Sequence, residues 1–256
     1  MLASLTIVTI LAAAAASGLI GSFALMRRMT LAADSMSHVA LPGLAIAGLF
    51  HVNPLIGGLV ALLLGAVLIW GIEQRTGIAT ETVIGVLFSV SLAVGALLST
   101  PEELLDLLFG NFHLLTNVEV IIGLIASLAI IIVMLALKER LTLSILSPEI
   151  AQTVGLNNRG LSLLYLIFFA INLILGLKFL GILLMGSLII IPAAAAKNWS
   201  WNLRSDLLLS VIISVVSVSV GLLISYTKQY ELGPAIISVA AGLFALSLIL
   251  RRKQNL

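Results

Sequence analysis

The sequence predicts an all-α membrane protein, a polytopic helical bundle of eight or nine transmembrane segments that form one domain over residues 1–256. Of its residues, 61% are hydrophobic and only 9% are charged, and the mean hydropathy is +1.25. Soluble domains carry about 25% charged residues, so this chain has too few charges to cover a surface that faces water. The apolar blocks continue along the whole length, which indicates the lipid bilayer rather than nucleic acid as the partner.

Nine segments meet or approach the roughly 20 apolar residues that a helix needs to cross a hydrocarbon core about 30 Å thick. The sixth and seventh are separated only by Lys178, so one of them could be re-entrant and eight spans stay possible. The first segment lacks a basic leader, so we expect a first span rather than a cleaved signal peptide. The nine segments are 3–26, 31–50, 54–72, 81–99, 117–137, 160–177, 179–197, 205–226 and 233–250.

The basic residues predict an orientation in which the N-terminus lies outside and the C-terminus lies in the cytoplasm. With nine spans in that orientation, 11 of the 13 lysines and arginines fall on the cytoplasmic side, as the positive-inside rule requires. Only Lys178 and Lys228 fall outside. The expected location is therefore the cytoplasmic (inner) membrane, with the chain crossing it many times.

Two connections are longer than turns. The first, residues 99–117, is predicted outside as a short interfacial helix, because its leucines recur at helical spacing beside Glu102, Glu103 and Asp106. The second, residues 138–160, is predicted in the cytoplasm.

Residues 147–155 of the second connection carry the signals of a short helix. Ser147 suits the N-cap, Pro148 the first helical position and Glu149 the first turn. Gly155 suits the C-terminal stop. We therefore expect a helix of about two turns that projects into the cytoplasm between two spans.

The second segment, residues 31–50, carries two ionisable side chains in a hydrophobic stretch. Asp34 and His38 are four residues apart, so they lie on one helical face and can point together into the bundle. A charge inside a membrane is costly unless it is paired or hydrated. Carboxylate and imidazole both suit a divalent transition metal, so the pair is a candidate metal site. Pro42 follows in the same segment and is expected to kink it.

A structural interpretation of the pair stays open at this point. Asp34 could cap the second helix, and His38 could donate a hydrogen bond to a neighbouring carbonyl. At 1.5 Å per residue, His38 would lie about 15 Å from Arg28 and near mid-membrane, which weakens the capping explanation. Spacing alone does not decide between the two. Glu73 and Arg75 are expected in a solvated turn.

Other chemistry is absent from the sequence. Without cysteine there are no disulfides and no thiolate metal sites. No Walker motif, glycine-rich phosphate loop or nucleophile triad occurs. The chain itself is therefore not expected to hydrolyse ATP or to hold a permanently bound cofactor.

The segment around Asp34 and His38 resembles the signature of a known family. The stretch DSMSHVALPGLAIAGLF, followed by NPL, is similar to that of the permease subunits of metal-ion ABC importers for zinc, manganese or iron. The resemblance covers nearly the whole chain. Five further blocks occur in the family order, namely ETVIGVLFSVSLAVGALLS, ELLDLLFGN, LSPEIAQTVGL, KFLGILLMGSLIIIPAAAA and GPAIISVAAGLFALSLIL.

The resemblance implies a type II ABC importer permease, similar in architecture to the vitamin B12 importer. Such a permease would act as a homodimer with two cytoplasmic ABC ATPase subunits and an extracytoplasmic metal-binding protein. Asp34 and His38 would then bind the divalent ion (Zn, Mn or Fe) in transit. The outer acids Glu102, Glu103 and Asp106 would face the binding protein. The ATPase-docking block would contain Ser147, Pro148, Glu149, Ala151 and Gly155.

Two other functions compete with this one. A secondary cation transporter or channel could use Asp34 as an ion or proton site, but the second half of the chain shows no counterpart of the Asp/His segment. A siderophore or cobalamin permease would need a wide cavity and no metal-ligand pair, so Asp34 and His38 disfavour it. The metal cannot be read from the ligands, because imidazole and carboxylate serve zinc, manganese and iron(II) alike.

Overall fold

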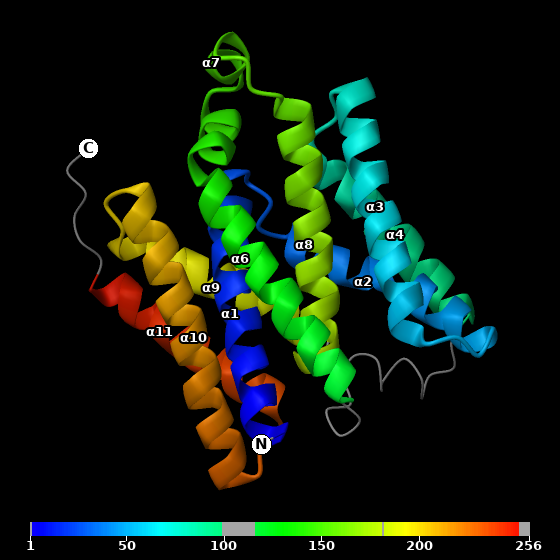
Figure 1. Cartoon of the computed structure of the whole chain (residues 1–256), viewed down its shortest axis with the longest axis vertical. Helices are drawn as coiled ribbons and strands as arrows, with labels where there is room; N and C mark the ends of the chain where they lie inside the picture. The colour runs from blue at the N-terminus through cyan, green and yellow to red at the C-terminus, as the bar shows by residue number, and fades with distance from the viewer. Residues whose placement is uncertain (1, 99–115, 181, 251–256) are drawn as a thin grey trace. The chain divides into compact units, whose positions relative to one another are not determined.

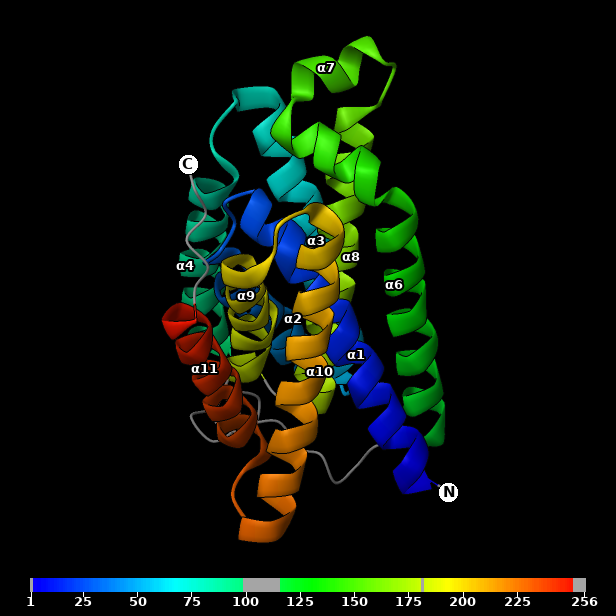
Figure 2. The ribbon, with the colours of Figure 1, turned by 90° about the vertical axis from the view of Figure 1, so that its left-hand side faces the viewer.

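The computed structural model describes residues 2–98, 116–180 and 182–250, and every regular element in these ranges is an α-helix (Figures 1 and 2). The expected outer helix, with Glu102, Glu103 and Asp106, lies outside the described residues. The helices are α1 (Leu2–Met26), α2 (Ala32–Leu49), α3 (Pro54–Thr76), α4 (Thr80–Leu98), α6 (Asn117–Leu146), α7 (Pro148–Thr153), α8 (Asn158–Leu180), α9 (Ile182–Trp199), α10 (Leu203–Lys228) and α11 (Leu232–Ile249).

Each of the nine expected segments is a long helix, but two boundaries differ. Helix α6 continues to Leu146 instead of ending near residue 137, so much of the expected cytoplasmic connection is helical. Its last turns consist of strong helix formers, and Pro148 is the first residue that disfavours continuation. Helix α8 likewise continues to Leu180, past Lys178, where the break was expected.

Seven described helices are long and apolar enough to cross a membrane, namely α1, α3, α4, α6, α8, α10 and α11. The remaining long helices, α2 and α9, have 18 residues each and contain Pro42 and Pro192. In α2, the polar Asp34 and His38 lower the hydropathy of the segment. Length and composition of the described part therefore support a multi-pass membrane protein with seven clear spans.

The described residues form two compact units. The first lies within Met1–Leu25, Leu114–Met134 and Ser187–Leu256, and the second within Met26–His113 and Leu135–Gly186. Helices α6 and α9 contribute to both units.

In the first unit, serine hydroxyls join α10 to α1. The Oγ atoms of Ser210 and Ser214 donate to the carbonyl oxygens of Gly18 and Ala14 at 2.6 and 2.7 Å. The helices approach so closely that a Cβ on Gly18 would lie 2.7 Å from the Ser210 carbonyl oxygen. Helix α11 packs against α10. Small residues and buried hydroxyls are typical of helix contacts inside membranes, where the hydrophobic effect contributes little to association.

In the second unit, α2 packs against α3, α4 and α8. Gly43 of α2 and Gly57 of α3 face each other, and a Cβ on either would overlap the carbonyl oxygen of the other. Helix α7 joins the end of α6 to the start of α8, as both views show (Figures 1 and 2). The unit therefore holds α2, with Asp34 and His38, against three neighbouring helices.

Helix α2 is α-helical from Ala32 to Leu49, with Pro42 inside it. The proline expected to interrupt this segment does not end the helix. Proline has no backbone N–H, so the carbonyl of His38, four residues earlier, loses its intrahelical donor. The sequence thus leaves one free backbone acceptor at the residue that also carries the imidazole.

Candidate functional site

Asp34 and His38 lie on the less buried face of α2. Asp34 is exposed and His38 is half-buried, whereas neighbours on the other face, including Ala33, Met36 and Ser37, are buried. The expectation that the two side chains share one helical face is therefore confirmed, but the expectation that they point into the bundle is wrong for Asp34, because the opposite face of α2 packs into the unit. The Asp34 side chain is therefore available to a ligand or to another chain, whereas the His38 side chain is half-buried.

The imidazole of His38 is positioned by α4 and has an unused nitrogen. Its ring lies 5.3 Å from the Phe88 ring, centroid to centroid, in an edge-on arrangement at 69°. Nδ1 is buried and has no hydrogen-bond partner among the described residues. An unpaired buried nitrogen costs free energy, and a rotation of the ring that brought this nitrogen to a ligand would recover that cost.

Asp34 lies in the first turn of α2 but is not its cap. The N-cap residue is Leu31, which makes no side-chain capping bond. Ser37 Oγ donates to the backbone carbonyl of Asp34 at 2.6 Å. The capping alternative is thus correct in placing Asp34 near the helix start and wrong in making it the cap.

Gly186 of α9 touches the backbone of Asp34. A Cβ at position 186 would lie 2.9 Å from Asp34 Cα and 3.0 Å from Asp34 N. Only glycine leaves the backbone of α2 this close to α9. The family-like block around residue 186 therefore contributes directly to the position of Asp34.

Two protein ligands are too few for a closed metal site. Among the described residues no group of three or more His, Cys, Asp or Glu side chains is placed to hold an ion. Structural metal sites usually have four or more ligands, whereas open positions are typical of sites that exchange what they bind. Asp34 and His38 therefore form a half-site that would need water, a backbone carbonyl or a second chain to complete it.

At one end of the second unit, three connections expected in the cytoplasm lie around a cavity of about 750 Å³. They are the link after α1, the turn between α3 and α4, and the α7 connection. The lining includes Arg28, Gln74, Thr80, Gln152 and Arg159. The three connections that the predicted topology assigns to one side of the membrane thus lie at the same end of this unit.

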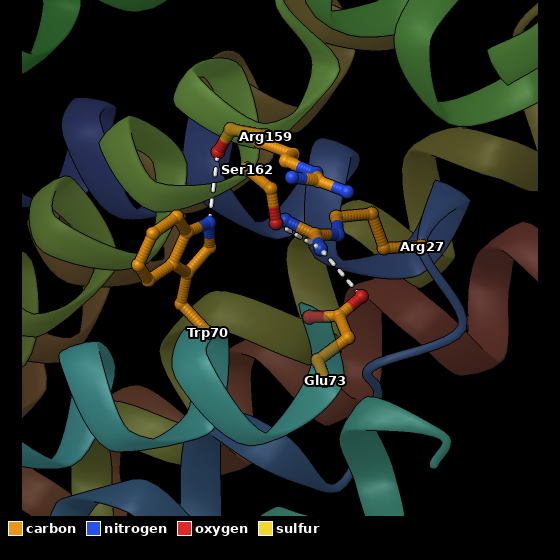
Figure 3. A network of polar contacts seen from close by, with 5 residues as sticks. All are labelled: Arg27, Trp70, Glu73, Arg159 and Ser162. Atoms are coloured by element: carbon orange, nitrogen blue, oxygen red, sulfur yellow. Dashed lines mark hydrogen bonds and ion pairs between the residues drawn. The ribbon is translucent and has the colours of Figure 1, made fainter. Parts of the chain in front are cut away.

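Arg27 lies beside this cavity in a cluster of polar contacts (Figure 3). Its Nη2 donates to Ser162 Oγ at 2.8 Å and lies 3.7 Å from Glu73 Oε1. Its guanidinium carbon lies 5.2 Å from the centroid of the Tyr165 ring. The side chains of Arg27 and Glu73 are only 12% and 25% exposed. The expectation of a solvated turn at residue 73 is therefore wrong, because Glu73 is inside α3 and paired with Arg27.

Helix α7 forms where the sequence predicts it, with a well-defined stop. Gly155 adopts a left-handed φ of 78°, and its N–H donates to the Gln152 carbonyl at 3.0 Å. The Leu156 N–H donates to the Ala151 carbonyl at 2.9 Å, which completes a Schellman motif. The helix, Pro148–Thr153, is shorter than the expected two turns.

The side chains of α7 differ in what they offer to a partner. Ser147 occupies the N-cap position but makes no side-chain capping bond. Ala151 is fully buried, so its side chain does not reach a partner directly. Glu149, Ile150 and Val154 are exposed. Sequence reasoning missed the two exposed aliphatic residues, although apolar side chains on a short helix predicted in water were a usable signal.

The sequence is similar to those of known transport proteins. The family model described as ABC 3 transport family matches residues 1–251. The chain is 30% identical to the high-affinity zinc uptake system membrane protein ZnuB of Haemophilus influenzae, covering 91% of this chain and 92% of ZnuB. It is 28% identical to the manganese import system permease protein ScaB of Streptococcus parasanguinis, covering 97% of this chain and 90% of ScaB.

Two solved structures share the fold. PsaBC from Streptococcus pneumoniae, in complex with Fab, matches 97% of this chain and 91% of its own with a TM-score of 0.83 at 26% identity. A putative metal-chelate type ABC transporter in an inward-facing conformation matches 96% of this chain and 85% of its own with a TM-score of 0.72. At 18% identity, the second match shows likeness of fold alone. Because the family model extends over nearly the whole sequence, the chain belongs to the ABC 3 transport family.

Proposed function

We propose that this chain is the transmembrane permease subunit of an ATP-driven importer that carries divalent transition metal ions, zinc, manganese or iron, into the cell. Family membership and relatives named as manganese and zinc permeases support the proposal. The observation that carries it is the Asp34–His38 pair on the less buried face of α2, where His38 Nδ1 has no hydrogen-bond partner among the described residues.

The metal would be cargo at this pair rather than a resident cofactor. A carboxylate and an imidazole suit zinc, manganese and iron(II) alike. Two protein ligands also leave the site weak enough to release the ion. A homodimer would bring a second pair to the symmetry axis, because a two-fold interface places the same residues of both copies around it. That arrangement supplies up to four ligands without a closed cage in either copy.

The remaining partners follow the same reasoning. Two ABC ATPase subunits would bind at α7, through the segment that contains Ser147, Pro148, Glu149, Ala151 and Gly155, and would hydrolyse the ATP. An extracytoplasmic metal-binding protein would dock at the outer acids Glu102, Glu103 and Asp106. The first assignment is supported by α7 itself, which is a short helix bounded by Ser147 at its start and by the turn at Gly155 after its end.

The proposed topology is that of a type II importer permease like the vitamin B12 importer, in the cytoplasmic membrane with the N-terminus outside. Eight or nine crossings are proposed, because one or both of α2 and α9 are added to the seven clear spans. The convergence of three basic, predicted cytoplasmic connections at one cavity supports this orientation.

The two competing functions have less support. A secondary transporter or channel would not need the coupling segment, and the family assignment favours an ABC system. A permease for siderophores or cobalamin shares the fold but has no use for Asp34 and His38. The cargo distinguishes the siderophore or cobalamin permease, and the dependence of uptake on the ATPase distinguishes the secondary transporter or channel.

The test is uptake by the permease purified with its ATPase and binding protein and reconstituted in proteoliposomes. Mass-traced Zn²⁺ and Mn²⁺ should accumulate on the side of the membrane where the ATPase lies. They should do so only when ATP is present on that side. Asp34→Asn and His38→Ala should each abolish uptake while the complex still assembles and binds ATP. Glu231→Gln and His51→Ala are matched controls, because both residues are exposed outside the site.

Wild-type uptake by both site variants would contradict the assignment and return the pair to a structural role. Uptake of a metal chelate in place of the free ion would favour the siderophore alternative. Uptake that persists without the ATPase would favour the channel or secondary transporter.

A further inference from the structure

We propose that Arg27 is a positioning residue that transmits movement of the α7 connection to the start of α2, and so to Asp34. This inference rests on the proposed function, since it assumes that an ATPase moves α7. The structural basis is the cluster of Arg27, Glu73, Ser162 and Tyr165, called here the Arg27 cluster. Figure 3 shows the first three of these residues.

The Arg27 cluster connects three parts of the chain through one guanidinium. Arg27 belongs to the link between α1 and α2, Glu73 lies near the end of α3, and Ser162 and Tyr165 lie on the first turns of α8. The hydrogen bond to Ser162 measures 2.8 Å, and Tyr165 is fully buried. A charged group held in a largely buried place needs these partners, because breaking one leaves a costly unpaired charge. Arg27 is therefore tied firmly to α8.

The start of α8 is in turn tied to α7 and α3. Asn158 Nδ2 donates to the carbonyl of Pro148, the first residue of α7, at 2.8 Å. Trp70 Nε1 of α3 donates to the Arg159 carbonyl at 2.9 Å (Figure 3). Both bonds use the first two residues of α8. A displacement of α7 thus acts directly on the helix that holds Arg27.

On its other side, Arg27 is close to the metal half-site along the chain. Arg28 has a left-handed φ of 59°, and Met29 is fully buried. The N–H of Ala32 donates to the Met29 carbonyl at 3.1 Å, so the link turns directly into α2. Asp34 follows in the first turn of α2. Because Met29 is buried and the link is short, a shift of Arg27 is expected to move the backbone of Asp34 at the start of α2.

The Arg27 cluster also has a second arrangement available. Glu73 Oε1 lies 3.7 Å from Arg27 Nη2, while Glu73 Oε2 is buried without a hydrogen-bond partner among the described residues. A shift of the guanidinium toward Glu73 would form a bidentate pair that engages both oxygens, and the same shift would lengthen the 2.8 Å hydrogen bond to Ser162. The adjoining cavity of about 750 Å³ gives the side chains room to rearrange. The guanidinium could therefore move between an arrangement centred on Ser162 and one centred on Glu73.

The test follows the environment of α2 in the intact complex of permease and ATPase. The sequence contains no cysteine, so Ser35→Cys places a single thiol beside Asp34. The rate of maleimide labelling at this thiol is measured with and without ATP. We expect ATP to change the rate about fivefold or more in the otherwise wild-type chain, within the usual range of coupling between sites.

Arg27→Gln should abolish this ATP-dependent change and lower metal transported per ATP hydrolysed by roughly tenfold, while ATP hydrolysis itself stays within about twofold. Arg27→Glu combined with Glu73→Arg should restore part of the response, because the pair is re-formed. Arg75→Gln is the matched control, as Arg75 is exposed at the end of the same helix as Glu73 and does not line the cavity.

The proposal would be overturned if the Arg27→Gln variant kept the full ATP-dependent change in labelling rate. It would also be overturned if the thiol introduced by Ser35→Cys did not respond to ATP in the otherwise wild-type chain. An equal loss of hydrolysis and transport would show a merely structural clamp and would also overturn it. If Arg27→Gln does not assemble, Ser162→Ala removes only the hydrogen bond, and an unchanged response in that variant would be equally decisive. Because labelling does not use the metal, a responding thiol without metal uptake would refute the cargo and leave the role of Arg27 standing.

Discussion

Gly186 of α9 lies against the backbone of Asp34, so close that a Cβ at position 186 would be 2.9 Å from Asp34 Cα. The backbone position of Asp34, a candidate metal ligand, therefore depends on a residue that lies 152 positions later in the sequence (186 minus 34). Because the two backbones touch, there is no room for a side chain at position 186.

Gly186→Ala should displace the start of α2 and lower uptake by roughly tenfold, which corresponds to about 1.4 kcal/mol. The added methyl group meets backbone atoms, which cannot rotate away, so overpacking of about 1–3 kcal/mol is expected. Gly85→Ala on α4 is the control, because a Cβ there meets nothing within 4 Å. Thermal unfolding of the purified chain and uptake by the complex should both separate the two variants; equal behaviour would mean that α9 does not constrain Asp34.

The second prediction concerns the energetic link between Asp34 and His38. If both side chains bind the same ion, the double variant Asp34→Asn/His38→Ala should bind Zn²⁺ no more weakly than the weaker single variant. Groups that share a ligand are not additive, whereas independent residues are. Titration calorimetry on the purified permease measures this directly. Additive losses would show that the two residues act separately.

The third prediction concerns the surface of α7. Ile150→Asp and Val154→Asp should weaken association with the ATPase without unfolding the chain, since these side chains are 55% and 62% exposed. Ala151→Glu should instead destabilise the α7 connection, because Ala151 is fully buried and a buried unpaired charge is costly. Co-purification of the two proteins and thermal unfolding of the permease distinguish these effects. Loss of stability in all three variants would reject the assignment of an exposed docking face.

The fourth prediction concerns the serines between α1 and α10. Ser210→Ala and Ser214→Ala each remove a buried hydrogen bond to a backbone carbonyl, at 2.6 and 2.7 Å. Each should lower the free energy of unfolding by about 0.5–1.5 kcal/mol. Ser238→Ala is the control, because the Ser238 hydroxyl bonds only within its own helix and is exposed. Denaturant titration in detergent gives the comparison; an equal loss in the control would point to intrinsic helix propensity.

Much of the helix pattern was predictable because apolar segments and breakers act locally. Pro148 and Gly155 set the ends of α7, and i,i+4 spacing placed Asp34 and His38 on one face. The predicted end of α6 near residue 137 is wrong, because the charged segment that follows continues the helix to Leu146. Polarity indicates where a chain meets water, and it does not indicate where a helix stops.

The sequence by itself determined the class of protein, the helical segments, and the placement of Asp34 and His38 on one face of α2. Each of these depends on composition or on spacing within one segment. Only the tertiary structure decided that Gly186 touches Asp34, that Ala151 is buried and that Glu73 pairs with Arg27. These contacts join residues far apart in the chain, and the packing of whole helices decides which of the many possible partners meet.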